Sequence, residues 1–345
     1  MKKIVGYVST RDLSGMREQD IRDLDVINIA FAHIKDGYAV WDAKGSKEAL
    51  NQIRNVNPEI KILLSIGGWG ADGFSQAAMT LDGRRKLADS ATELMIKYGL
   101  NGIDIDWEYP GSSLAGIKSH PEDKKNFSLL LKTLREKLNT LGTGRMLTIA
   151  AGGDTYFTTL TDLKEISNYV DYVQLMTYDL QGGFQKVTGH HAALYHGRRN
   201  IIDACMDKAV RIFKEAGLPE EKMVAGVPFY SRKWSSVKGG GDGLGQEAKT
   251  TGCYGPDYSQ LTKYYINKKG YCRYWDDEAI APYLFDGSTF ISYEDQESLA
   301  EKIAYIKKKG LGGIMFWEYN CDSTGTLIPF IKQEIDKKIE GKKVR

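Results

Sequence analysis

Short apolar segments alternate with amphipathic segments along the whole chain. The apolar segments have the length of β-strands, and several of them lack polar positions, as expected for strands that are covered on both faces. The predicted strands are Ile4–Val8, Val26–Ala32, Lys61–Ile66, Gly102–Glu108, Met146–Ala151, Tyr172–Tyr178, Met223–Phe229 and Gly313–Trp317. The clearest helical periodicity between them covers Arg84–Tyr98, Glu122–Leu138, Ile202–Ala216 and Glu297–Lys309. Gly217 and Gly310 stand where helix C-terminal caps are expected.

Eight βα units in series predict an α/β fold, a closed (β/α)8 TIM barrel. A doubly wound open sheet is the alternative, and the absence of a GxGxxG motif after the first strand disfavours it. The interval between the predicted strands that start at Met223 and Gly313 is far longer than the earlier intervals. We therefore expect a small α+β insertion between strands 7 and 8, over residues 232–291, within a catalytic barrel made of residues 1–231 and 292–345.

Composition excludes several classes of protein. The chain has 345 residues, of which 42% are hydrophobic and 27% charged, as in ordinary globular proteins. A net charge of +2 gives no reason to expect nucleic acid or an anionic membrane as a partner, and no apolar run reaches the ~18 residues that span a bilayer. We expect a monomer, cytoplasmic as the chain is written, or secreted if a leader is missing.

The four cysteines show no CxxC spacing, which favours free thiols. Whether Cys253 and Cys272 pair is left open by the sequence.

The segment Asn101–Pro110 contains three acidic residues at alternate positions. Because side chains of a strand alternate between its faces, Asp104, Asp106 and Glu108 all point to one side, the barrel interior. Burying unpaired charge is costly, so packing alone does not explain them. Glu108 lies at the carboxyl end of the strand, where such barrels place catalytic groups.

Three interpretations of this cluster stay open on spacing alone. Crowded carboxylates share protons and raise the pKa of at least one member, which favours a general acid, with Glu108 the best placed. The same oxygens suit Mg²⁺ or Ca²⁺. A structural network is the third interpretation. His190 and His191 lack a third ligand at a suitable spacing, so we predict no metal site there.

The segment Gly102–Pro110 resembles the strand-four signature of glycoside hydrolase family 18, the chitinases and their relatives. Further segments resemble family motifs in the expected order, from about Ile4 to Asp322. These segments are Ser65–Trp69, Met176–Asp179, Gly226–Tyr230 and Gly312–Glu318, with Tyr274–Asp277 and Ala281–Tyr283 in the insertion.

The resemblance implies a retaining, substrate-assisted hydrolysis that needs no cofactor and no metal. Glu108 would protonate the glycosidic oxygen, and the 2-acetamido carbonyl oxygen of the substrate would be the nucleophile. Asp106 would bind the acetamido N–H, with Asp104 behind it sharing a proton. Tyr178 would hold the acetamido oxygen in place.

Other residues are expected to contact substrate. Asp179, Met176 and Gln174 would line the sugar site, and Trp317 would form its apolar floor. Trp69 stacks on a sugar or caps the barrel core, and Trp275 belongs to the cleft wall or to the insertion core. Tyr7 and Phe31 are expected to line the barrel and touch the sugar. The remaining expected contacts are Tyr230 and Arg232.

Two positions depart from the family pattern. Asn101 stands where many members have Asp. Ser231 stands where Gly commonly precedes the Arg, so the resemblance supports a substrate contact by Arg232 less firmly than the other contacts.

We predict a chitinase that hydrolyses β-1,4 bonds in chitin or chito-oligosaccharides. The alternatives are an endo-β-N-acetylglucosaminidase acting on N-glycan or peptidoglycan glycans, and a non-catalytic chitin-binding lectin of the same fold.

Overall fold

Eight parallel strands form a closed barrel in the computed structural model, which describes residues 2–337. The ring closes because the first strand pairs with both the second and the last, for example Val5 with Val26 and with Met315. The barrel strands are β1 (Lys3–Ser9), β2 (Val26–Lys35), β4 (Lys61–Gly67), β5 (Gly102–Asp106), β6 (Met146–Gly152), β7 (Tyr172–Met176), β8 (Met223–Pro228) and β14 (Gly313–Trp317). The predicted (β/α)8 barrel is confirmed.

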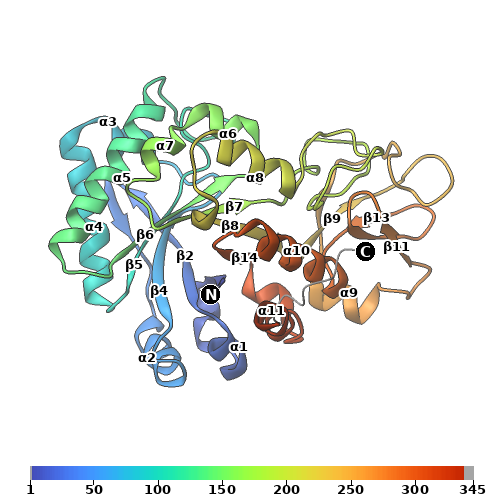
Figure 1. Ribbon diagram of the computed structural model, residues 1–345, viewed down its shortest axis with the longest axis horizontal. Coiled ribbons are helices and arrows are strands. Elements are labelled where there is room, and N and C mark those ends of the chain that lie inside the picture. The colour runs from blue at the N-terminus through green and yellow to red at the C-terminus, as the bar shows by residue number, and fades with distance from the viewer. Residues whose placement is uncertain (1, 338–345) are drawn as a thin grey trace.

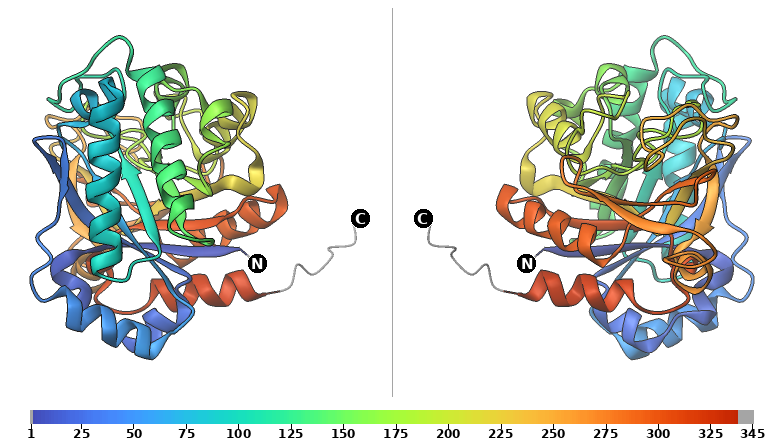
Figure 2. Two further views of the ribbon diagram at one scale, coloured as in Figure 1. Left: turned by 90° about the vertical axis from the view of Figure 1, so that its left-hand side faces the viewer. Right: turned by 90° about the vertical axis from the view of Figure 1, so that its right-hand side faces the viewer.

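Helices surround the ring, and the first and last parts of the chain lie side by side (Figures 1 and 2). The α-helices are α1 (Glu18–Asp23), α2 (Ser46–Val56), α3 (Phe74–Met79), α4 (Leu81–Lys97), α5 (Asp123–Thr140), α6 (Thr155–Leu160), α7 (Leu163–Ile166), α8 (Met206–Glu215), α10 (Gln296–Lys309) and α11 (Leu327–Asp336). Short 3-10 turns are η1 (Thr10–Gly15), η2 (Glu220–Lys222) and η3 (Tyr319–Asp322), and β3 (Tyr38–Val40) pairs antiparallel with β2.

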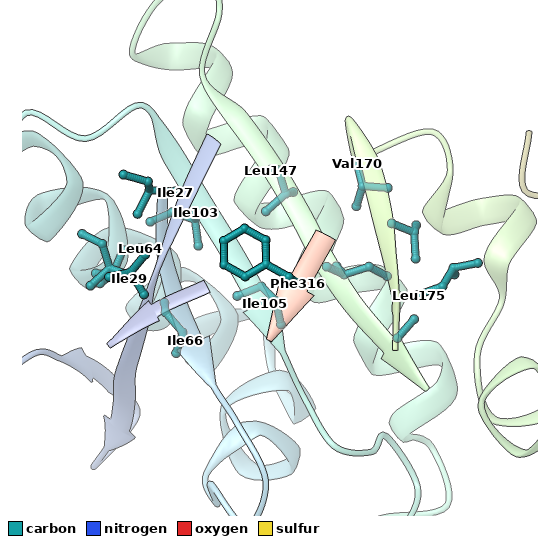
Figure 3. Packing of buried hydrophobic residues seen from close by; sticks show 14 of the residues in the cluster. Ile27, Ile29, Leu64, Ile66, Ile103, Ile105, Leu147, Val170, Leu175 and Phe316 are labelled. Carbon is teal, nitrogen blue, oxygen red and sulfur yellow. The ribbon is translucent and has the colours of Figure 1, made fainter. Parts of the chain in front are cut away.

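The main core lies between the barrel and its helices. Ile103, Ile105 and Trp107, which alternate with the acidic residues, are all buried in it. Figure 3 shows Ile103 and Ile105 within this core. The Trp107 ring packs between Phe74 at a centroid distance of 5.3 Å and Phe127 at 5.5 Å. One face of this segment is therefore anchored by apolar burial, and the anchoring fixes the direction of the acidic face.

The segment between β8 and β14 forms a second, antiparallel sheet in the order β10-β9-β13-β12-β11. Figure 1 shows this insertion beside the barrel. Its elements are β9 (Tyr230–Trp234), β10 (Cys253–Asp257), α9 (Tyr258–Tyr264), β11 (Cys272–Asp276), β12 (Ala281–Phe285) and β13 (Phe290–Ser292).

The order of the strands answers the question about the two cysteines of the insertion. Cys253 lies on β10 and Cys272 on β11, at opposite edges of the sheet. Neighbouring strands are about 4.8 Å apart, so four strand spacings separate the thiols by far more than a disulfide can bridge. Both thiols are free and exposed.

One predicted helix begins later than the sequence pattern suggests. Helix α8 starts at Met206, because Cys205 has an extended backbone (φ −161°) and caps the helix through its Sγ. Ile202 and Ala204, just before it, line the large cleft described below. Among residues 2–337, no helix is long and apolar enough to cross a membrane.

Candidate active site

A cleft of about 780 Å³ opens at the carboxyl ends of the barrel strands. Asp106 ends β5, and Glu108 and Tyr178 follow β5 and β7 directly. All three line the cleft, together with Arg232 from the insertion. This is the end of a TIM barrel where substrates bind and react.

Asp104 is the innermost of the three carboxylates and is fully buried. Its Oδ2 accepts hydrogen bonds from the Tyr7 hydroxyl (2.8 Å) and the Ser65 hydroxyl (2.7 Å). Its Oδ1 accepts from the Thr148 hydroxyl (2.6 Å) and from Gln174 Nε2 (2.8 Å). Burial raises the pKa of Asp104, and these four donors oppose the increase. Both oxygens of this buried carboxyl group therefore have hydrogen-bond partners, which hold the side chain in one position.

Asp106 is buried next to it with a different environment. Its Oδ1 has no hydrogen-bond partner, although the atom is inaccessible to solvent. Burial, followed by the nearby charges of Glu108 and Asp104, raises the pKa of Asp106 well above its usual value. These surroundings therefore favour the protonated form of Asp106 over its ionised form.

Glu108 is the outermost carboxyl group and lines the cleft. Burial and the charge of Asp179 raise its pKa to about 7, against an opposing hydrogen bond from Tyr109. A carboxyl group that is still protonated near neutral pH can act as a general acid.

Two glycines allow the neighbouring strand to approach this segment. A Cβ atom at Gly67 would lie 1.9 Å from the Asp106 carbonyl oxygen, and Gly67 has a φ of +127°. The Gly68 N–H donates to the same oxygen at 2.9 Å. Only glycine fits this close contact between β4 and the acidic strand.

Aromatic rings form the floor of the cleft beside the carboxylates. Trp317 stacks on Phe31 with ring centroids 5.4 Å apart and an interplanar angle of 19°. The ring centroids of Tyr7 and Trp317 are 5.5 Å apart, and those of Tyr178 and Tyr230 are 6.2 Å apart. A flat apolar surface next to acidic groups suits a pyranose ring, which has an apolar face and a polar rim.

Asp179 also lines the cleft and is held by an arginine. Arg232 donates from Nε to Oδ1 at 2.6 Å and from Nη2 to Oδ2 at 2.5 Å. Burial alone would raise the pKa of Asp179, but hydrogen bonds from His191 and Arg232 hold it well below its usual range. Asp179 is therefore an anion at the pH of any ordinary assay. The Tyr254 ring covers the Arg232 guanidinium at 4.0 Å.

The cleft brings together most of the residues expected from the sequence. Eleven of them line it: Tyr7, Phe31, Trp69, Asp106, Glu108, Met176, Tyr178, Asp179, Tyr230, Arg232 and Trp317. Trp69 is 56% exposed, as a stacking platform requires, and does not cap the core.

Two expected contact residues lie elsewhere. Gln174 is fully buried below the cleft, where its Oε1 accepts from Asn28 and its Nε2 donates to Asp104 and the Tyr7 hydroxyl. It supports the carboxylates instead of facing a ligand, because its polar atoms already have partners. Trp275 lies in a separate shallow groove with Arg198 and Glu278, outside the lining of the main cleft.

The two departures from the family pattern have local explanations. Asn101 lies at the amino end of β5, where its Oδ1 accepts from the Ile62 N–H at 2.9 Å, so it serves strand pairing far from Glu108. The Ser231 hydroxyl donates to the Pro256 carbonyl oxygen inside the insertion. Its neighbour Arg232 still reaches the cleft.

Several lining residues were not predicted from the sequence. Tyr109 follows Glu108 directly and could have been included with it. Phe184 lies in a glycine-rich loop, and Tyr254 lies on the short strand β10 of the insertion. Phe184 is 71% exposed and Tyr254 66% exposed. For residues 2–337, no group of three His, Cys, Asp or Glu side chains is arranged to hold a metal ion.

The raised pKa of Glu108 predicts a stability effect. A folded-state pKa above the unfolded value means that folding is favoured below the unfolded pKa and loses this contribution as pH rises towards about 7. Glu108→Gln removes the ionisable group, so the variant should melt at a higher temperature than the unaltered chain at pH 8, with a smaller difference at pH 5. Calorimetry at both pH values measures this.

Glu93→Gln makes the same chemical change on an exposed helix position and is the control. An equal difference in melting temperature at pH 5 and pH 8 for Glu108→Gln would contradict the raised pKa.

The comparisons with known proteins agree with this geometry. The profile of glycosyl hydrolases family 18 matches residues 3–322. Chitinase A1 of Niallia circulans is 40% identical over 318 residues, which cover 86% of this chain and 46% of that protein. Chitinase B of Serratia marcescens is 29% identical and matches over 93% of this chain and 81% of its own length.

A solved family 18 N-acetylglucosaminidase from Paenibacillus barengoltzii has a TM-score of 0.95 and 45% identity, covering 97% of this chain and 100% of that one. The chain spans less than two thirds of the curated relatives chitinase A1 (46%) and chitotriosidase-1 of Mus musculus (61%). With the family profile matching nearly the whole chain, we conclude that this chain belongs to glycosyl hydrolases family 18.

Proposed function

We propose that this chain is a chitinase-type glycoside hydrolase that cleaves β-1,4 bonds between N-acetylglucosamine units, with retention and with assistance from the substrate. The observation that carries the proposal is the arrangement of three carboxyl groups that lead into the cleft. The innermost, Asp104, is buried and hydrogen-bonded, and the outermost, Glu108, has a pKa raised to about 7. The named chitinases among its relatives support the substrate class.

The partners of the other acidic lining residues support assistance by the substrate. A two-carboxylate glycosidase needs a second free carboxylate as nucleophile or base. Asp154 caps α6, Asp179 is paired with Arg232, and Asp203 is paired with Lys208. Asp106 is the remaining candidate, and burial together with the nearby charges of Glu108 and Asp104 disfavours its ionised form, which is the form that a nucleophile or base needs.

An N-acetyl group on the substrate would supply the missing nucleophile. Its carbonyl oxygen attacks C1 from the face opposite the leaving group, while Glu108 gives its proton to the glycosidic oxygen as the C1–O bond breaks. A carboxyl oxygen of Asp106, which lines the cleft, accepts the acetamido N–H, and Tyr178 orients the carbonyl oxygen. Water then adds to C1 of the oxazolinium ion as the bond between C1 and the acetamido oxygen breaks, and it gives a proton to the Glu108 carboxylate. The two inversions at C1 retain the β configuration.

An N-acetylglucosaminidase that releases single sugars is a second candidate. The name of the Paenibacillus barengoltzii enzyme, similar over its whole length, favours it. The bond cleaved and the chemistry are the same in both cases, and the length of the first products distinguishes them.

Replacing the proposed acid tests the catalytic role. We expect Glu108→Gln to lower kcat on N-acetylglucosamine hexamer by about 10²–10⁴-fold, because the leaving oxygen loses its proton donor. Binding of the hexamer, measured by calorimetry, should persist because the aromatic floor is unchanged. Activity follows from chromatography of the products.

Glu93→Gln is the matched control and should hydrolyse the hexamer like the unaltered chain. Near-normal turnover by a folded Glu108→Gln variant would remove Glu108 from the role of acid. Binding of the hexamer by the unaltered chain without any cleavage would indicate a lectin.

The substrate-assisted route predicts a strict requirement for the acetamido group. A glucosamine hexamer that lacks N-acetyl groups should remain uncleaved under conditions in which the N-acetylated hexamer is consumed, since no other nucleophile is present. Mass spectrometry of both reactions measures this. Comparable hydrolysis of the two hexamers would show that the acetamido group is not the nucleophile.

A further inference from the structure

Two adjacent histidines, His190 and His191, are both buried, and each ring contacts a different aspartate. His190 Nε2 lies 3.0 Å from Asp276 Oδ2 in the insertion. His191 Nδ1 lies 3.4 Å from Asp179 Oδ1 in the cleft. The two neighbours are matched in residue type and burial, but only one of them contacts a residue that lines the cleft.

We propose that His191 is a positioning residue for Asp179, which it holds through a neutral ring whose proton is on Nδ1. The inference rests on the proposed function, since it assigns Asp179 to the reacting site. Arg232 donates to both oxygens of the Asp179 carboxylate, and His191 provides a further contact to Oδ1.

The surroundings of the ring determine the tautomer. Asp179 is an anion and only accepts hydrogen bonds, so the contact at 3.4 Å requires the proton on Nδ1. His191 Nε2 is inaccessible to solvent and has no hydrogen-bond partner. Burial lowers the pKa of His191, and the charges of Arg232 and Lys302 act in the same direction against Asp179. A second proton on Nε2 would therefore be a buried, unpartnered donor, which is costly.

The backbone at His191 is fixed from three directions. Its N–H donates to Ser292 Oγ at 3.0 Å, and its carbonyl oxygen accepts from the Leu180 N–H at 3.0 Å. The next carbonyl oxygen, that of Ala192, accepts from the fully buried Lys302 ammonium on α10, which also pairs with Glu294. A buried ammonium held by a carboxylate and a carbonyl oxygen makes a rigid attachment.

This attachment of His191 explains how Asp179, which lies outside regular structure, keeps one orientation. Asp179 follows β7 and has a left-handed backbone (φ 57°). Such a conformation persists where the surroundings hold it. The connection runs from α10 through Lys302, Ala192 and His191 to the carboxylate whose charge acts on Glu108.

The first test needs no substrate. In ¹⁵N-histidine-labelled protein, the His191 ring should show the neutral Nδ1–H tautomer from pH 5.5 to pH 8, with the signal assigned by its absence in His191→Asn. A neutral Nε2–H tautomer, or a ring that titrates in this range, would overturn the proposal.

Three variants then test the positioning role. We expect His191→Leu to lower kcat on N-acetylglucosamine hexamer about ten-fold or more with little change in KM, because misplacement of a group in the reacting site acts on the transition state. His191→Asn should restore most of kcat, since its amide nitrogen can donate from nearly the position of ring Nδ1. His190→Leu is the matched control, which should lower the melting temperature and leave kcat unchanged.

The outcomes separate the possible failures. Equal loss of kcat in His190→Leu and His191→Leu, or no rescue by His191→Asn, would show that the loop matters only for folding. If the unaltered chain does not cleave the hexamer, the proposed function fails, and the ring tautomer still decides whether His191 holds Asp179.

Discussion

The structure of the site depends on one constraint, namely that three carboxyl groups stand at alternate positions of β5 and of the two residues that follow it. Charges this close cannot all be ionised in a buried environment, so protons must be distributed among them. Asp104 accepts hydrogen bonds from four donors, which stabilise its ionised form. Asp106 and Glu108 have raised pKa values, which favour their protonated forms. Burial and the charge of Asp179 raise the pKa of Glu108 to about 7, which suits the role of general acid that we propose for it.

The fold serves this constraint from both sides of the strand. Trp107 and its alternating isoleucines are buried against helices, so the acidic face cannot rotate away from the barrel interior. Gly67 lets the neighbouring strand β4 lie close against the backbone of Asp106. Asp179 adds a negative charge near Glu108 without becoming protonated itself, because Arg232 and His191 hold it as an anion.

Residues in alternating strands or in motifs that resemble those of the family could be predicted from the sequence, and residues outside both could not. The barrel strands and the alternation of Asp104, Asp106 and Glu108 follow from local patterns that the tertiary structure preserves. Gln174 shows the limit of this reasoning, because alternation predicts an inward side chain but not its depth in the barrel. Tyr254 shows another limit. It reaches the cleft through the pairing of β10 with β9, a long-range contact that leaves no signal in the local sequence.

The most direct test of the account is the anomeric configuration of the first product. Proton NMR spectra recorded in the first minutes of hydrolysis of the N-acetylglucosamine tetramer distinguish the two anomers before mutarotation mixes them. The account predicts that the new reducing end appears as the β-anomer, because attack by the acetamido oxygen followed by water inverts C1 twice. An α-anomer as the first product would mean direct attack by water, and would contradict the role assigned to the three carboxylates.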